Sequence, residues 1–230
     1  MKKHINSIAE LCRADPDNII RAFERKNRTI IFYIALIVIG SGIYGATIGL
    51  WRAPLQAFYT AIKFPLLILF TTIGNTLLNG MLAQLLGINI SFRQSLMAIF
   101  ASFAIASVIL ASLSPITLFM ILNTPPLESA HASLSHNFTL IIHVFIIAFA
   151  GISANICLFR LLLYFCKEFS TACKVLFCWL LGNMFLGCQL SWIMRPFVGC
   201  PTLPIEFFRS DAFNGNFYES VFRSLCNLLK

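Results

Sequence analysis

Five long stretches of this 230-residue chain contain no Asp, Glu, Lys or Arg. They are Thr29–Trp51, Phe64–Phe92, Gln94–Leu127, Ser129–Phe159 and Val175–Met194, which are 23, 29, 34, 31 and 20 residues long. A helix needs roughly 20 apolar residues to cross a hydrocarbon core of about 30 Å, so each stretch is long enough for one passage. The stretches are continuously apolar rather than alternating, which excludes a membrane β-barrel.

The composition also indicates a membrane protein. Hydrophobic residues make up 58% of the chain and charged residues 11%, whereas soluble domains contain about 25% charged residues. The sequence therefore predicts an all-α, polytopic membrane protein, a bundle of five transmembrane helices with surface amphipathic helices at both ends. The predicted helices span about 29–51, 64–88, 94–122, 136–160 and 171–194. Pro65 fits the first turn of the second helix, and Pro115 is expected to kink or shorten the third.

Two segments flank the predicted transmembrane domain, residues 29–194. Residues 1–28 form a basic segment with apolar residues at helical spacing, which favours contact with anionic lipid headgroups through Arg21, Arg25, Lys26 and Arg28. Residues 195–230 form an aromatic-rich tail, whose second half predicts an interfacial helix. Either the N-terminal helix or the tail could contact a protein partner.

The distribution of Lys and Arg predicts the orientation. Eleven of them would lie on the side of the N-terminus and six on the opposite side, which places the N-terminus in the cytoplasm and the C-terminus outside it. The small size and the lack of a targeting signal favour a bacterial inner membrane. The basic residues are spread over both faces and accompany no nucleic-acid-binding motif, so nucleic acid is not an expected partner.

Several polar residues fall inside the predicted helices. Asn75 and Asn79 share one face of the second helix, and Asn183, Gln189 and Arg195 belong to the fifth helix or its end. They could line a solute site in the bundle, but amides in membranes also hydrogen-bond helices together, and we favour this second interpretation. Small residues such as Gly45 and Gly49 predict close helix contacts.

Signatures of catalysis and cofactor binding are not found. All nine acidic residues lie outside the charge-free stretches, which argues against an ion-driven pump. Motifs of metalloproteases, serine hydrolases and phosphate-binding loops are missing, so no catalytic residue, metal or cofactor is predicted. His136 and His143 lie too far apart to hold one metal ion without a third ligand, and His143 is predicted to be a buried, hydrogen-bonded histidine.

Part of the chain, residues 55–125, resembles the Yip1-like membrane proteins. The resemblance depends on a polar-lined helix, a short turn and the sequence Ser91-Phe92-Arg93-Gln94-Ser95-Leu96, followed by a helix that breaks at Ser114-Pro115. It implies a five-helix bundle with a cytoplasmic N-terminus and no enzymatic activity. The Arg195-Pro196-Phe197 segment and the tail have no counterpart in that family.

These observations predict a non-enzymatic membrane scaffold or accessory protein that acts through helix–helix, lipid and protein contacts. The alternative is a small-solute transporter or channel lined by Asn75, Asn79, Asn183, Gln189 and Arg195. A lipid-modifying enzyme without a recognised motif is a third, weaker hypothesis.

Overall fold

The computed structural model describes residues 8, 11–13, 19–20, 27–85, 90–125, 129, 132–200 and 203–228. Six helices are defined in these ranges: α3 (Asn27–Leu50), α4 (Pro54–Leu85), α5 (Phe92–Leu122), α6 (Ala132–Cys166), α7 (Phe169–Met194) and α8 (Phe217–Leu228). Five of them, α3 to α7, are long and apolar enough to cross a membrane. The prediction of five such helices is therefore confirmed.

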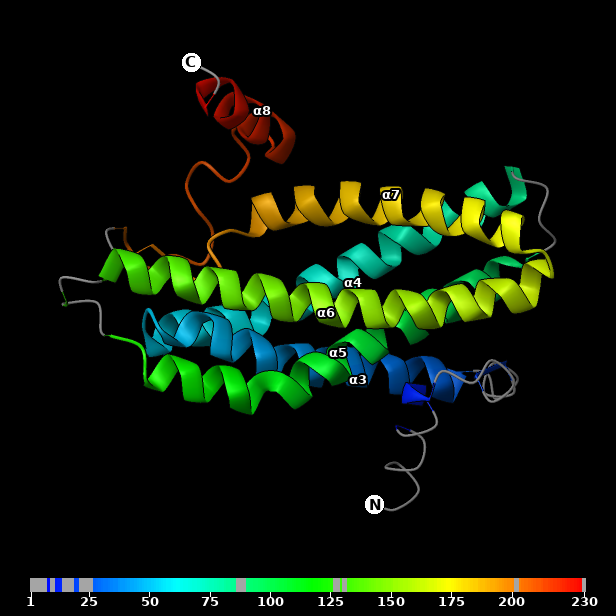
Figure 1. The fold of residues 1–230 in the computed structure, drawn as a ribbon, viewed down its shortest axis with the longest axis horizontal. Coiled ribbons are helices and arrows are strands. Elements are labelled where there is room, and N and C mark those ends of the chain that lie inside the picture. The colour runs from blue at the N-terminus through cyan, green and yellow to red at the C-terminus, as the bar shows by residue number, and fades with distance from the viewer. Residues whose placement is uncertain are drawn as a thin grey trace.

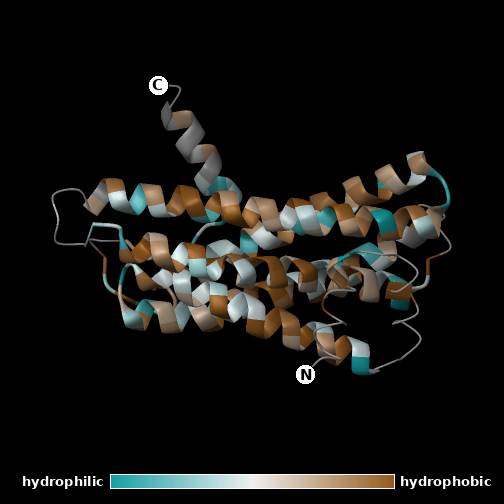
Figure 2. Ribbon diagram, turned by 60° about the horizontal axis from the view of Figure 1, so that its bottom comes forward, coloured by the Kyte–Doolittle hydropathy of each residue, from teal (hydrophilic) through white to brown (hydrophobic). Residues whose placement is uncertain are grey.

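The five long helices lie side by side along the long axis of the molecule, and consecutive helices run in opposite directions (Figure 1). Contacts join α4 to α5, α5 to α6, α6 to α7 and α7 back to α4. We call these four helices the ring. α3 packs against α4 and α5, while α8 projects from α7 and contacts it through its first turn (Figure 1). Figure 2 shows that apolar residues dominate the long helices.

The helix α4 begins at Pro54, well before the start at residue 64 that the charge-free stretch predicts. Its 32 residues extend about 48 Å, whereas a hydrocarbon core is about 30 Å thick. Lys63 is fully buried within the helix, and its ammonium group donates a hydrogen bond to the carbonyl oxygen of Pro196 at 3.0 Å. The lysine therefore does not end the helix, and Pro65 lies inside it rather than in its first turn.

The helix α5 starts with a capping box. The hydroxyl of Ser91 accepts a hydrogen bond from the backbone N–H of Gln94, and the side-chain oxygen of Gln94 accepts one from the backbone N–H of Ser91. These two bonds satisfy backbone donors that have no partner in the first turn of a helix. Pro115 does not end this helix, which continues to Leu122 and is followed by Asn123 as its C-cap.

Close backbone approach explains how α3 packs. A Cβ atom placed on Gly45 would lie 2.6 Å from the carbonyl oxygen of Thr60, and one on Gly49 would lie 2.5 Å from that of Gln56. Only glycine fits at such distances, so the predicted contact role of these glycines is confirmed. On the same helix, Tyr44 shares a 2.8 Å hydrogen bond with Nδ1 of His143, which is buried as predicted.

The two flanking segments are described only in part. Leu11 and Ile19 are buried and belong to the hydrophobic core, so these apolar residues of the N-terminal segment pack on the bundle. Arg28 is exposed in the first turn of α3, whereas Arg21, Arg25 and Lys26 lie outside the described residues. The second half of the tail forms a helix, α8, while its place at a membrane surface stays a prediction.

Candidate functional site

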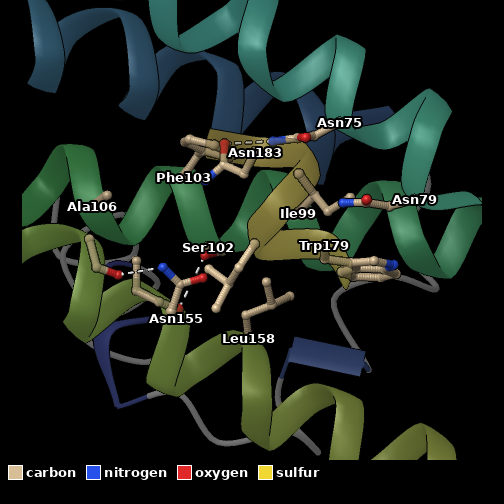
Figure 3. Close-up of a pocket in the computed structure, with 13 residues that line it drawn as sticks. Asn75, Asn79, Ile99, Ser102, Phe103, Ala106, Asn155, Leu158, Trp179 and Asn183 are labelled. Carbon is tan, nitrogen blue, oxygen red and sulfur yellow. Dashed lines mark hydrogen bonds between the residues drawn. The ribbon is translucent and has the colours of Figure 1, made fainter. Parts of the chain in front are cut away.

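The ring surrounds a small cavity of about 70 Å³ (Figure 3). All four ring helices contribute to its wall: Asn75 and Asn79 from α4; Ile99, Ser102, Phe103 and Ala106 from α5; Gly151, Ala154, Asn155 and Leu158 from α6; Trp179, Leu180 and Asn183 from α7. Four asparagines therefore meet in one cavity, whose other lining residues are mostly apolar.

Hydrogen bonds use part of this polar surface. The amide nitrogen of Asn75 donates to the side-chain oxygen of Asn183 at 2.6 Å, and this bond joins α4 to α7 (Figure 3). On α6, the amide of Asn155 donates to the carbonyl oxygen of Gly151 at 2.8 Å. The hydroxyl of Ser102 on α5 donates to the carbonyl oxygen of Ala154 at 3.1 Å, which joins α5 to α6.

Three buried side-chain atoms of the cavity wall lack a partner in the described part of the chain: the acceptors Oδ1 of Asn75 and Oδ1 of Asn79, and the donor Nε1 of Trp179. Asn75 is 1% exposed and Asn79 is 2% exposed. Leaving a buried polar group without a hydrogen bond costs about 1–3 kcal/mol, so such groups in a folded protein need an explanation. The cavity volume suffices for a few water molecules or a solute of a few heavy atoms.

The electrostatic character of the cavity is polar but neutral, because none of the residues that line it is ionisable. An ion would have to leave water without meeting an opposite charge, at an effective cost of several kcal/mol. The cavity is therefore suited to uncharged molecules that form hydrogen bonds.

The buried polar face of α4 extends beyond the cavity. Its members are at most 5% exposed and lie three to four residues apart along most of the helix: Gln56, Thr60, Lys63, Thr71, Thr72, Asn75, Thr76 and Asn79. The hydroxyls of Thr71, Thr72 and Thr76 bond to carbonyl oxygens of their own helix. Leu67 interrupts the face between the cavity and the start of the helix.

The first turns of α4 bind the segment that follows α7, residues 195–200, which we call the strap. Gln56 donates to the carbonyl oxygens of Pro196 and Phe197 at 3.1 and 2.7 Å, and Thr60 donates to that of Phe197 at 3.0 Å. The ammonium group of Lys63 also lies 5.0 Å from the ring centre of Phe207. The strap thus covers the end of the α4 polar face.

The predicted site residues divide into two groups. Asn75, Asn79 and Asn183 meet at the cavity. Gln189 lies elsewhere, where its side-chain oxygen accepts a hydrogen bond from the backbone of Phe217. Arg195 forms a 2.9 Å ion pair with Asp211 and stacks on Trp192, so it also lies outside the cavity.

Comparisons of the chain with protein-family models, curated proteins and solved structures found no match. The resemblance to Yip1-like proteins therefore stays a prediction. The most specific element of this resemblance is the segment that begins at Ser91. In the structure, Ser91 and Gln94 form the capping box of α5, and the start of any helix can require such a box.

Sequence reasoning did not identify Ser102, Asn155 or Trp179 as cavity residues. Asn155 is the one of the three with a usable signal, because it is an amide inside an apolar stretch, and such residues favour the interior of a bundle. Ser102 and Trp179 occur in contexts that equally suit packing between helices.

Proposed function

We propose that this protein binds a small, uncharged solute within the membrane and mediates its passage. The observation that carries the proposal is the pair of unpartnered oxygens of Asn75 and Asn79 in a cavity that four helices surround. Helix association alone would favour amides that bond to each other, as Asn75 and Asn183 do. The remaining oxygens suit a ligand.

The rest of α4 supports this proposal. A passage needs polar groups beyond a single cavity, and the buried polar face continues from Asn79 to Gln56 apart from the interruption at Leu67. The strap covers its far end through Gln56, Thr60 and Lys63, so passage requires that the strap move. This arrangement describes a closed state of the pathway.

The experiment uses purified protein in proteoliposomes, with solute entry followed by stopped-flow light scattering. Asn75→Leu with Asn79→Leu removes both unpartnered oxygens, and we expect the protein-dependent flux to disappear while the protein stays folded. The matched control is Ser112→Ala with Ser153→Ala, because these two hydroxyls bond to carbonyls of their own helices and lie outside both the cavity and the polar face of α4. Equal flux in the Asn variant and the wild type would contradict the proposal.

A scaffold function is the second candidate, and the position of α8 favours it. Tyr218 stacks on Phe185 of α7, whereas Phe222 one turn further is 68% exposed. A helix held at one end offers an apolar surface to a partner. Cross-linking from Phe222 in native membranes tests this candidate, and recovery of neither a specific protein nor a specific lipid would count against it.

The orientation and the location of the protein are also proposals. We infer a cytoplasmic N-terminus in a bacterial inner membrane. Arg52 and Lys63 would lie at the opposite end, where they bind carbonyl oxygens of residues 196–203, and Arg195 pairs with Asp211. These basic residues of the predicted outer side thus make contacts within the protein, which supports the orientation inferred from the count of Lys and Arg.

A further inference from the structure

We infer that the cavity selects solutes that carry an NH2 group, such as urea or a small primary amide, over solutes of similar size that offer a single N–H or O–H donor. This inference rests on the proposed function and names its substrate class. It follows from the positions of two acceptor atoms relative to one glycine of α7.

The two unpartnered oxygens face the same point. A Cβ atom placed on Gly182 would lie 3.7 Å from Oδ1 of Asn75 and also 3.7 Å from Oδ1 of Asn79. Twice this distance, 7.4 Å, is therefore the most that can separate the two oxygens. Asn75 and Asn79 are one turn apart on α4, which also places them side by side on one helix face. Both acceptors thus border the space next to Gly182.

The chemistry of this space requires donors. Each oxygen accepts hydrogen bonds and neither can donate, so a ligand between them must supply two N–H or O–H groups in different directions. One NH2 group has two such hydrogens on a single atom, and urea has two NH2 groups. A single hydroxyl has one hydrogen and would leave one of the two oxygens without a partner.

The consequence for selectivity is large, because a site built to hydrogen-bond a ligand discriminates against analogues that leave a buried group unpaired. The expected preference for an NH2 solute over a single-donor solute of similar size is about tenfold. Ammonium ions also carry N–H donors, but the neutral lining offers no counter-charge, so they are expected to be excluded.

Gly182→Ala tests the geometry without disturbing the fold. The added methyl group would lie at ordinary contact distance from both oxygens and 4.0 Å from Leu78, so nothing has to move. It would fill the space next to Gly182 that the two acceptor oxygens border. Gly187→Ala is the matched control, because its added methyl group on the same helix would meet only Thr71, at 3.9 Å.

The experiment measures the entry of urea, acetamide, N-methylacetamide and ammonium into proteoliposomes that contain the wild type, Gly182→Ala or Gly187→Ala. N-methylacetamide has a single N–H donor and would leave one of the two oxygens without a partner. We expect the protein-dependent entry of urea and acetamide to be about ten times faster than that of N-methylacetamide, and we expect Gly182→Ala to abolish this preference while Gly187→Ala keeps it. Circular dichroism and gel filtration verify that each variant is folded.

Three results would overturn the inference, and they differ in what they say of the proposed function. Equal rates for urea and N-methylacetamide, both lost in Asn75→Leu with Asn79→Leu, would refute the NH2 selectivity and leave solute passage intact. Ammonium entry faster than urea would refute a neutral substrate. Rates equal to those of protein-free liposomes for every solute would refute the proposed function and the inference together.

Discussion

The strap is held by more hydrogen bonds than its carbonyl groups need, and this redundancy makes a sharp prediction. The carbonyl oxygen of Phe197 accepts hydrogen bonds from Gln56 at 2.7 Å and from Thr60 at 3.0 Å. The carbonyl oxygen of Pro196 likewise accepts from Gln56 and from Lys63. Removing one donor therefore leaves each carbonyl group with another.

The magnitudes follow from this arrangement. Gln56→Leu removes hydrogen bonds worth about 1 kcal/mol each, but it also removes the buried side-chain oxygen of Gln56, which has no partner and costs about 1–3 kcal/mol. The two effects offset each other. Thr60→Val lowers the free energy that holds the strap on α4 by about 1 kcal/mol. In the double variant the carbonyl oxygen of Phe197 loses both donors. We therefore expect this free energy to fall by about 1–3 kcal/mol beyond the sum of the single changes.

The assay uses Cys200, which lies in the strap and is partly buried. The rate of its alkylation by a membrane-impermeant maleimide, located by peptide mass spectrometry, reports how often the strap leaves α4. We expect rates within a few-fold of the wild type for each single variant. In the double variant, the coupling corresponds to an increase in the alkylation rate of about 5–150-fold beyond the product of the two single effects.

The control for the Cys200 assay is Thr71→Val with Thr72→Val. This change removes two hydroxyls of α4 that do not contact the strap, so the rate of Cys200 alkylation should stay unchanged. The contradicting result is a double variant, Gln56→Leu with Thr60→Val, whose fold increase in alkylation rate equals the product of the fold increases in the two single variants. The carbonyl oxygen of Phe197 would then not anchor the strap, and the reasoning would fail.

Three further predictions concern the ring, α3 and the cavity. A double-mutant cycle between Asn75→Ala and Asn183→Ala, measured by unfolding in detergent, should give a coupling free energy of about 0.6–1.7 kcal/mol, and no coupling would mean that the amides do not bond. Gly45→Ala should lower the unfolding free energy by about 1–3 kcal/mol because its methyl group would collide with the backbone of Thr60, whereas Gly151→Ala, which meets nothing within 4 Å, should not lower it. The solute preference, which the cavity determines, should not vary between pH 5 and 9, since no residue that lines the cavity is ionisable, and a preference that titrates near neutral pH would point to an ionisable group at the site.

The sequence was sufficient to predict the number of long helices, because the absence of charge over a stretch matched to a bilayer is a local property. The start of α4 could not be predicted in the same way. Lys63 looks like the end of an apolar stretch, but contacts with Pro196 and Phe207, more than 130 positions away, allow it to lie buried inside the helix. A contact of that separation leaves no sign in the local pattern.

The cavity was predictable only in part, for a similar reason. The spacing of Asn75 and Asn79 shows that they share a helix face, and their cost in lipid predicts that this face points into the bundle. Which residues of other helices face them depends on the rotation of each helix about its own axis. That rotation brings Asn183 and Asn155 to the cavity. It turns Gln189 towards the tail instead.

The most direct test of the account is an electron cryo-microscopy structure in lipid nanodiscs, at a resolution that shows ordered water, with urea present and absent. The account predicts density within hydrogen-bond distance of Oδ1 of both Asn75 and Asn79, next to Gly182, with a shape that changes when urea is added. Two amides that bond to protein groups instead, with side chains filling the space between the ring helices, would contradict it.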